Sequence, residues 1–183
     1  MASDFILSTF DFKSDEAGKD IIAALMQAAD RGVQVRVIVD GFNGVLKLTG
    51  NKYFKALVSC PGVSIKIYNP ISPFRPWDLQ ARLHDKYLII DESMYMLGGR
   101  NTMELFLGDY SEQKNMDREL FVYETETPDE TASISQVKRY FETIWALPDS
   151  REYVCRKKTS SIEQAEKELR ERYGYLKETY QEA

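Results

Sequence analysis

The stretch LHDKYLIIDESMYMLGGRN, residues 83–101, decides the fold because it contains two strand patterns joined by a short polar turn. Residues 83–90 are mainly apolar and β-prone, and residues 95–97 resume that pattern after the turn at 91–93. Such a pattern predicts two strands connected by a tight turn. The first of these strands carries His84, which is the one histidine in the chain.

Residues two apart on a strand share one face, so we expect His84 and Lys86 to point the same way. Leu83, Tyr87 and Ile89 are then expected to occupy the other face. A lysine inside an otherwise apolar strand is costly to bury unless it binds an anion. Although a single histidine is more often structural than catalytic, the pair predicts a phosphate or carboxylate site.

The end of the same stretch supports an anion site. Gly98 and Gly99 would let the backbone approach a ligand closely and present N–H groups to an anion. Asn101 adds an amide donor, and Arg100 between them completes the predicted substrate-binding set. Asp91 differs from His84 by an odd number of residues, so we expect it to face away and to be structural.

The residues upstream predict a strand–helix–strand unit. Residues 5–10 and 33–39 are short apolar strands, and residues 17–30 form an amphipathic helix between them. This unit favours a right-handed crossover between parallel strands. The sequence therefore predicts an α/β domain with a mixed, mostly parallel β-sheet flanked by helices.

Further elements follow from the same patterns. Helices are expected at 51–59, 135–147 and 161–183, strands at 63–68 and 118–123, and loops at 40–44 and 69–77. The second loop carries Phe74, Arg75 and Trp77, which either line a pocket mouth or pack on the core.

The composition indicates one folded domain followed by a different kind of segment. We assign residues 1–150 to the domain and residues 151–183 to a charged helical tail or linker. The apolar positions of that tail form a thin stripe, which either docks on the domain or leads to something absent from the chain.

Charge and cysteine content limit the possible functions. The net charge of −5 weighs against non-specific nucleic-acid binding, which usually requires a basic face. Cys60 and Cys155 show no metal-ligand spacing and are expected to be free thiols in a reducing compartment. No apolar run approaches the roughly 18 residues that span a bilayer.

The spacing His-x-Lys, four residues, Asp, six residues, Gly-Gly-x-Asn resembles the HKD motif of the phospholipase D superfamily. Residues 5–41 resemble the opening unit of bacterial cardiolipin synthase-like proteins, and Gly99 in place of serine is similar to that branch. The resemblance covers residues 5–147. It implies a phospholipase D-like half-domain.

The resemblance implies a role for each matching residue. His84 would attack phosphorus and form a phosphohistidine. Asp117 would accept a hydrogen bond from the other ring nitrogen, by the logic of a catalytic triad. Lys86 and Asn101 would hold the phosphate oxygens, while Asp91 stays structural. Neither a metal nor another cofactor is implied.

The family needs a second HKD histidine as general acid, and this chain has none. Either two copies pair, or the chain is the amino-terminal half of a two-motif protein. The abrupt start and the charged tail favour the second arrangement.

The function implied is phosphodiester transfer or hydrolysis on glycerophospholipids. The alternatives are a homodimeric single-HKD nuclease or phosphodiesterase, and a catalytically incomplete phosphate-binding fragment. Nucleic acid is a disfavoured partner. We expect this chain to be cytoplasmic and the intact bacterial protein to work at the cytoplasmic membrane surface.

Overall fold

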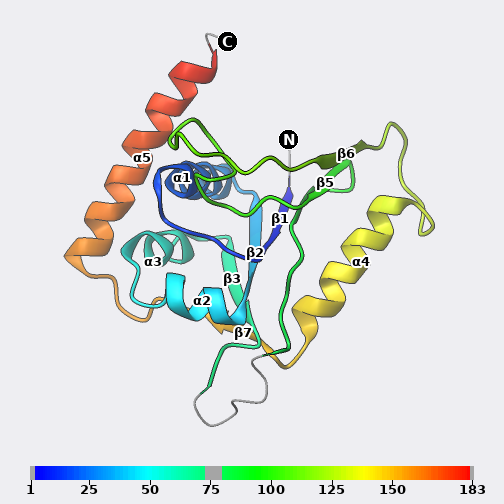
Figure 1. Ribbon diagram of the computed structural model, residues 1–183, viewed down its shortest axis with the longest axis horizontal. Helices are drawn as coiled ribbons and strands as arrows, with labels where there is room; N and C mark the ends of the chain where they lie inside the picture. The colour runs from blue at the N-terminus through cyan, green and yellow to red at the C-terminus, as the bar shows by residue number, and fades with distance from the viewer. Residues whose placement is uncertain (1–2, 73–79, 182–183) are drawn as a thin grey trace.

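A computed structural model describes residues 3–72 and 80–181, so the predicted loop residues Phe74, Arg75 and Trp77 lie outside the described part. Within that part, a seven-stranded sheet runs in the order β6-β5-β4-β1-β2-β3-β7 and has helices on both faces (Figure 1). The strands are β1 Asp4–Thr9, β2 Gln34–Asp40, β3 Val63–Tyr68, β4 Tyr87–Ile90, β5 Met94–Gly98, β6 Glu119–Tyr123 and β7 Ser150–Tyr153. The helices are α1 Glu16–Asp30, α2 Gly41–Leu48, α3 Lys52–Val58, α4 Ser133–Ala146 and α5 Ser160–Gln181. The predicted α/β class with a mixed, helix-flanked sheet is confirmed.

The prediction that this sheet is mostly parallel is wrong. β2 pairs in parallel with β1 and β3, whereas β1–β4, β3–β7, β4–β5 and β5–β6 are antiparallel. A parallel pair needs a crossover connection such as α1, but the tight turn at 91–93 permits only antiparallel pairing. The sheet is therefore a parallel βαβ unit extended by antiparallel strands.

Two predicted element boundaries are also wrong. The strand expected at 83–90 begins only at Tyr87, because its partner β1 ends at Thr9 and the ladder stops where Ser8 faces Tyr87. The loop expected at 40–44 is the start of α2, where the Asp40 carboxylate accepts hydrogen bonds from the backbone N–H groups of the first turn. His84 and Lys86 therefore lie in an extended segment before β4.

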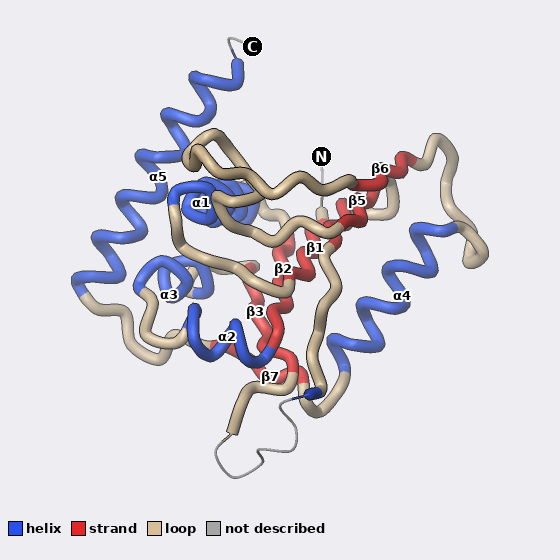
Figure 2. Tube along the Cα trace, viewed as in Figure 1, coloured by secondary structure: helices blue, strands red, loops and turns tan. Residues whose placement is uncertain are grey.

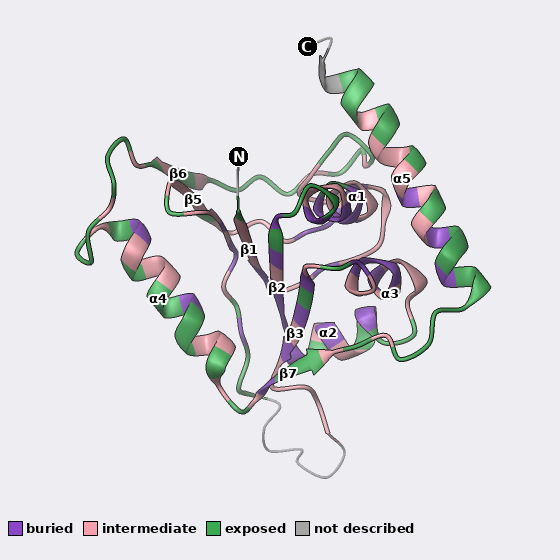
Figure 3. Ribbon diagram, turned by 180° about the vertical axis from the view of Figure 1, so that it is seen from behind, coloured by how far each residue is buried: buried purple, intermediate pink, exposed green. Residues whose placement is uncertain are grey.

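The two faces of the sheet carry separate cores. α1, α3 and α5 lie on one face and α4 covers the other, as Figures 1 and 3 show from opposite sides. Leu83, Tyr87 and Ile89 are all buried in the core beneath α4, so the prediction that they share a face is confirmed. That core holds the segment before β4 against the sheet.

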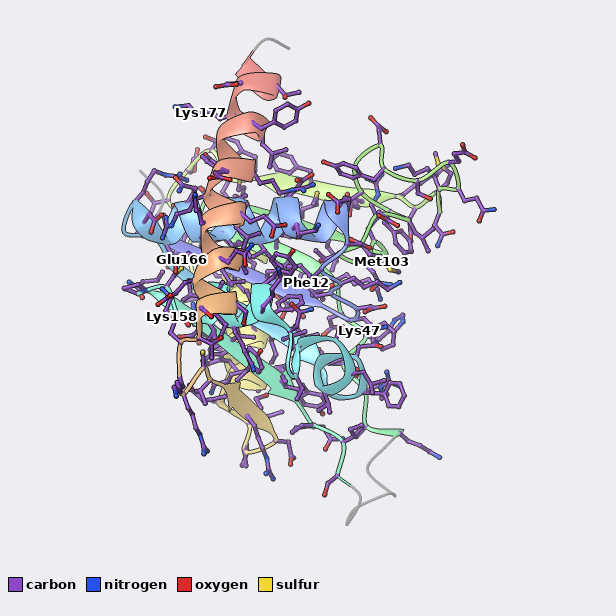
Figure 4. All side chains as sticks on the ribbon, turned by 90° about the vertical axis from the view of Figure 1, so that its left-hand side faces the viewer. Phe12, Lys47, Met103, Lys158, Glu166 and Lys177 are labelled. Carbon is purple, nitrogen blue, oxygen red and sulfur yellow. The ribbon has the colours of Figure 1, made fainter. Side chains whose placement is uncertain are left out.

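The predicted tail is packed against the rest of the chain. β7, which the sequence did not predict, pairs with β3, and α5 buries Ile162, Ala165 and Leu169 against the core that includes α1 and α3. Figure 4 views α5 from outside, with Phe12 behind it. Of the two alternatives for the tail, docking is confirmed, while the boundary at residue 150 stays a prediction.

An ion-pair network fixes α5 to α1. The Arg172 guanidinium donates to the Asp20 carboxylate at 2.5 Å and to the Glu16 carboxylate at 2.8 Å. It also contacts the Tyr110 hydroxyl, which donates to Asp20 at 2.6 Å. The segment between β5 and β6 is thereby tied to both helices, and Figure 2 shows it running out to them and back.

None of the helices in the described residues is both long enough and apolar enough to cross a membrane.

Asp91 lies in the turn between β4 and β5, with a positive φ of 53°. Its carboxylate accepts hydrogen bonds from the backbone N–H groups of Ser3 at 2.7 Å and Asp4 at 2.8 Å, and from the Ser3 hydroxyl. Partial burial acts to raise the pKa of Asp91, but these hydrogen bonds outweigh it and hold that pKa below its usual value. The turn is thus joined to the start of β1.

We expect Asp91→Asn to lower the free energy of unfolding by about 1 kcal/mol at pH 7, since it removes charge-assisted hydrogen bonds at a partly exposed site. Asparagine still tolerates the positive φ. Because the pKa of Asp91 is lowered by folding, its stabilisation is present above the unfolded value of 3.8 and is lost as pH falls through the folded pKa. Urea unfolding at pH 7 and below pH 4 measures the effect. The exposed Asp109→Asn serves as control, and a difference that does not shrink in acid would contradict the expectation.

Candidate active site

The predicted site residues gather at one edge of the sheet. β1 and β2 end at this edge, and β5 ends there too because it is antiparallel to β4, which is antiparallel to β1. His84 and Lys86 precede β4, Gly98–Asn101 end and follow β5, and Asp117 precedes β6. Asp91 lies at the opposite edge, five residues from Lys86, or about 17 Å of extended chain. We expected strand parity to turn Asp91 away from His84. The two residues are in fact separated because they lie at opposite edges of the sheet.

His84 and Lys86 are in direct contact. The Lys86 ammonium lies 3.2 Å from His84 Nδ1 and donates to the His84 carbonyl oxygen at 2.8 Å. The same ammonium lies 3.4 Å from His84 Nε2, so it is close to both ring nitrogens. The imidazole is exposed and packs on the Phe10 ring at a centroid distance of 4.4 Å. The ring is thus contacted by the Lys86 ammonium and by the Phe10 ring, although the residue remains exposed.

Lys86 is a buried cation close to acidic groups. Only 8% of its surface is exposed, and burial lowers the pKa of its ammonium, although Asp85 and Asp117 act to raise it. Burying a positive charge costs free energy unless an anion compensates it. The side chain is therefore suited to bind a phosphate oxygen beside the imidazole.

Asn101 is oriented by the loop after β1. Its side-chain oxygen accepts a hydrogen bond from the Asp11 backbone N–H at 3.3 Å, which leaves its amide N–H groups with no partner among the described residues. The neighbouring Thr102 hydroxyl donates to the Thr9 hydroxyl, and its backbone N–H donates to the Asp11 carbonyl. These bonds hold the predicted donor next to the end of β1.

Gly98 and Gly99 both lie against acidic side chains, and the predicted anion contact of Gly99 stays a prediction. The Gly98 N–H donates to the Lys86 carbonyl, so it is not available to an anion. A Cβ on Gly99 would lie 1.9 Å from Asp117 Oδ2, and one on Gly98 would lie 2.4 Å from Glu119 Cγ. The two glycines therefore make room for acidic side chains.

Asp117 does not contact the His84 ring in this structure. Its Oδ1 accepts from the Arg118 N–H at 2.8 Å, and no hydrogen bond joins it to His84 among the described residues. Arg100 reaches the Asp117 carbonyl at 3.4 Å and lies 3.7 Å from the Glu119 carboxylate. The predicted role of Asp117 in orienting the histidine stays a prediction.

Asp40 and Arg82 position the histidine segment, and the sequence reasoning missed both roles. Asp40 is fully buried, and its carboxylate accepts from the Arg82 guanidinium at 2.7–3.1 Å and from the Leu83 N–H at 3.1 Å. The Arg82 guanidinium also lies 5.0 Å from the centroid of the Phe10 ring on which His84 packs. Two features of the sequence could have indicated these roles. One is the arginine two residues before the histidine, and the other is the aspartate at the end of β2.

No group of three or more His, Cys, Asp or Glu side chains within residues 3–72 and 80–181 is arranged to hold a metal ion.

Comparison with known proteins gives one family. A family model described as "Cardiolipin synthase, PLD-like domain" matches residues 2–145. Cardiolipin synthase B of Salmonella typhi is 34% identical over 118 residues, which cover 61% of this chain and 27% of that protein. The major cardiolipin synthase ClsA of Bacillus subtilis is 37% identical over 104 residues, covering 56% of this chain and 21% of that protein. The chain thus matches about a quarter of the length of these relatives.

A solved structure shares the fold. The phospholipase D family member Nuc from Salmonella typhimurium superimposes with a TM-score of 0.59 over 84% of each chain, at 17% sequence identity.

We expect Asp40→Ala to lower the free energy of unfolding by about 3 kcal/mol, because it strands a partly buried guanidinium and removes the acceptor of several backbone N–H groups. The double variant Asp40→Ala/Arg82→Ala should be more stable than Asp40→Ala alone, since no unpaired cation is left. Urea denaturation measures both, with the exposed Asp109→Ala as control. A loss below about 1 kcal/mol for Asp40→Ala would contradict this account.

Proposed function

The chain belongs to the phospholipase D-like domain family of cardiolipin synthase, and from that premise we propose that it transfers or hydrolyses phosphodiesters of glycerophospholipids through a phosphohistidine on His84. The observation that carries the proposal is the contact between the exposed His84 ring and the buried Lys86 ammonium, 3.2 Å apart. A nucleophile and a cation that can hold the phosphate under attack are thus adjacent. The relatives' descriptions as cardiolipin synthases support the lipid substrate.

The proposed reaction has two displacements at phosphorus. In the first, an unprotonated ring nitrogen of His84 forms a bond to phosphorus, and the bond from phosphorus to the leaving alkoxide breaks. In the second, an acceptor alcohol or water attacks phosphorus and gives its proton to the group that protonated the leaving alkoxide, and the phosphorus–nitrogen bond breaks to regenerate His84. Lys86 and Asn101 would hold the non-bridging oxygens in both steps, and such a donor typically contributes about 100- to 1000-fold to the rate.

Asp117 is proposed to orient His84 during the reaction. Its carboxylate lies against Gly99 at the same edge of the sheet, and it interacts electrostatically with Lys86. When Lys86 turns to a phosphate oxygen, the imidazole is released to rotate, so that its N–H can donate to a carboxylate. Apo geometry is often looser than that of the reacting complex, so the missing hydrogen bond does not remove Asp117 from the mechanism.

The leaving alkoxide must receive a proton, and the chain's single histidine is already the nucleophile. We propose that a second half-domain supplies the general acid, either from the remainder of a longer protein or from a second copy. Apolar side chains exposed next to Asp117 would be covered by such a partner; they are Met116, Leu120, Phe121 and Tyr123. The intact protein is proposed to act at the membrane surface, where its substrate lies.

We expect the isolated chain to react once with bis(p-nitrophenyl) phosphate, because this leaving group departs as a stable anion and needs no acid. A burst of nitrophenolate and an acid-labile adduct seen by intact mass spectrometry should both disappear in His84→Ala. Lys86→Ala should slow the burst by about 100-fold or more, and Asp117→Asn should slow it less. Asp91→Asn should leave the burst unchanged, and an undiminished burst in His84→Ala would overturn the nucleophile assignment.

Phosphatidylglycerol, whose leaving alkoxide needs a proton, should not be turned over by the isolated chain at any concentration. If the rate per chain instead rises with protein concentration, a second copy supplies the acid. A rate per chain that is independent of concentration would mean that the chain carries its own acid, contrary to the proposal. Cleavage of DNA or RNA without lipid turnover would favour the nuclease alternative.

A further inference from the structure

A cavity of about 150 Å³ opens beside the candidate phosphate-binding residues. Lys86, Arg100 and Asn101 line it at the edge of the sheet where the reaction is proposed to occur, together with Glu119, whose carboxylate lies 3.7 Å from Arg100. The rest of its lining is mainly apolar and comes from β1, β4, β5, α1 and the segment after β5; these residues are Phe5, Leu7, Ile21, Leu88, Met96 and Leu107. Charge and apolar surface are thus separated along one cavity.

This apolar lining follows from the pairing of the strands. Leu7 faces Leu88, and Leu88 faces Met96, so the three side chains form a row across the sheet. The row lies on the α1 side, because Ile6 and Ile89 on the alternate positions are buried beneath α4. The row begins next to Lys86, which precedes Leu88 by two residues and shares its face.

A second hollow of about 430 Å³ adjoins the first. Ile21 and Leu107 line both hollows, and the second one extends between α1 and α5 to Ala24, Tyr173 and Leu176. Asp20 also borders it, but its carboxylate is already bonded to Arg172 and Tyr110. Lys177, near the exposed end of α5 in Figure 4, can contribute its aliphatic stem.

We propose that the two hollows together hold one acyl chain of the glycerophospholipid whose phosphate binds at Lys86 and Asn101. This inference rests on the proposed function and adds to it the place where the lipid tail lies. The argument is that two adjoining hollows are lined mainly by apolar side chains and that the buried Lys86 lines one of them, which matches a molecule with an anionic head and an apolar tail. Nucleic acid has no long flexible apolar chain, and its affinity comes largely from phosphate contacts.

The test uses monomeric phosphatidylglycerols with acyl chains of four, six and eight carbons, bound to the 183-residue chain and followed by calorimetry. The dissociation constant should fall about fourfold for each methylene that enters the apolar path. Glycerophosphoglycerol, which lacks acyl chains, should bind most weakly. A dissociation constant that does not change with chain length would overturn the inference.

Ala24→Trp gives a matched test, because Ala24 is an exposed helical position that borders only the outer hollow. The indole should fill that hollow and weaken binding of the eight-carbon lipid by roughly tenfold, with no effect on the four-carbon lipid. Lys167→Trp, at an exposed position of α5 that borders neither hollow, should bind both lipids as the unchanged chain does. If both variants bind the eight-carbon lipid equally well, the acyl chain does not enter the outer hollow and the inference is wrong.

The two proposals fail in different ways. If the nitrophenolate burst depends on His84 but chain length has no effect on binding, the proposed reaction stands and the acyl path is wrong. If the burst is absent, the proposed function fails whatever the lipids do. Neither Ala24→Trp nor Lys167→Trp should change the burst, since neither residue lies at the phosphate end.

Discussion

The buried carboxylate of Asp40 is the constraint on which the site depends. It is fully shielded from solvent, yet it accepts hydrogen bonds from the first turn of α2, from the Arg82 guanidinium and from the Leu83 N–H. A buried charge is tolerated only when its oxygens are paired in this way. Because Asp40 ends β2 and Leu83 precedes His84, one side chain fixes the segment that carries His84 to the end of the parallel unit, although this segment belongs to no strand.

The two ends of the HKD-like motif are separated by a short strand. His84 and Lys86 lie at the edge where β1 ends, and Asp91 lies at the other edge, bonded to the first residues of β1. β4 is thus held at both ends by carboxylates, Asp40 through Leu83 and Asp91 through Ser3 and Asp4. The two halves of the motif therefore lie at opposite ends of β4.

The sequence predicted those parts of the fold that depend on local patterns. The βαβ unit, the strands around the turn at 91–93 and the contact of His84 with Lys86 follow from periodicity and spacing. Local patterns could not predict three other features, because each depends on a partner far away in the chain. These are the antiparallel pairs of the sheet, the strand β7 and the role of Asp40. Asp-Gly at 40–41 favours a loop locally, but the buried carboxylate caps a helix instead. The space that Gly99 leaves for Asp117 could not be predicted either, because Asp117 lies 18 residues further along the chain.

The residues of the motif and the surface next to them give different information about the substrate. Lys86 beside His84 suits any phosphodiester, so the residues of the motif do not choose between lipid and nucleic acid. The choice depends on what lies next to them. A nucleic-acid site continues from phosphate to phosphate along a basic surface, but the path from Lys86 continues over Leu88, Met96 and Leu107, and the chain carries a net charge of −5. Apolar surface adjoining a single cationic end favours a ligand with one phosphate and a long apolar tail.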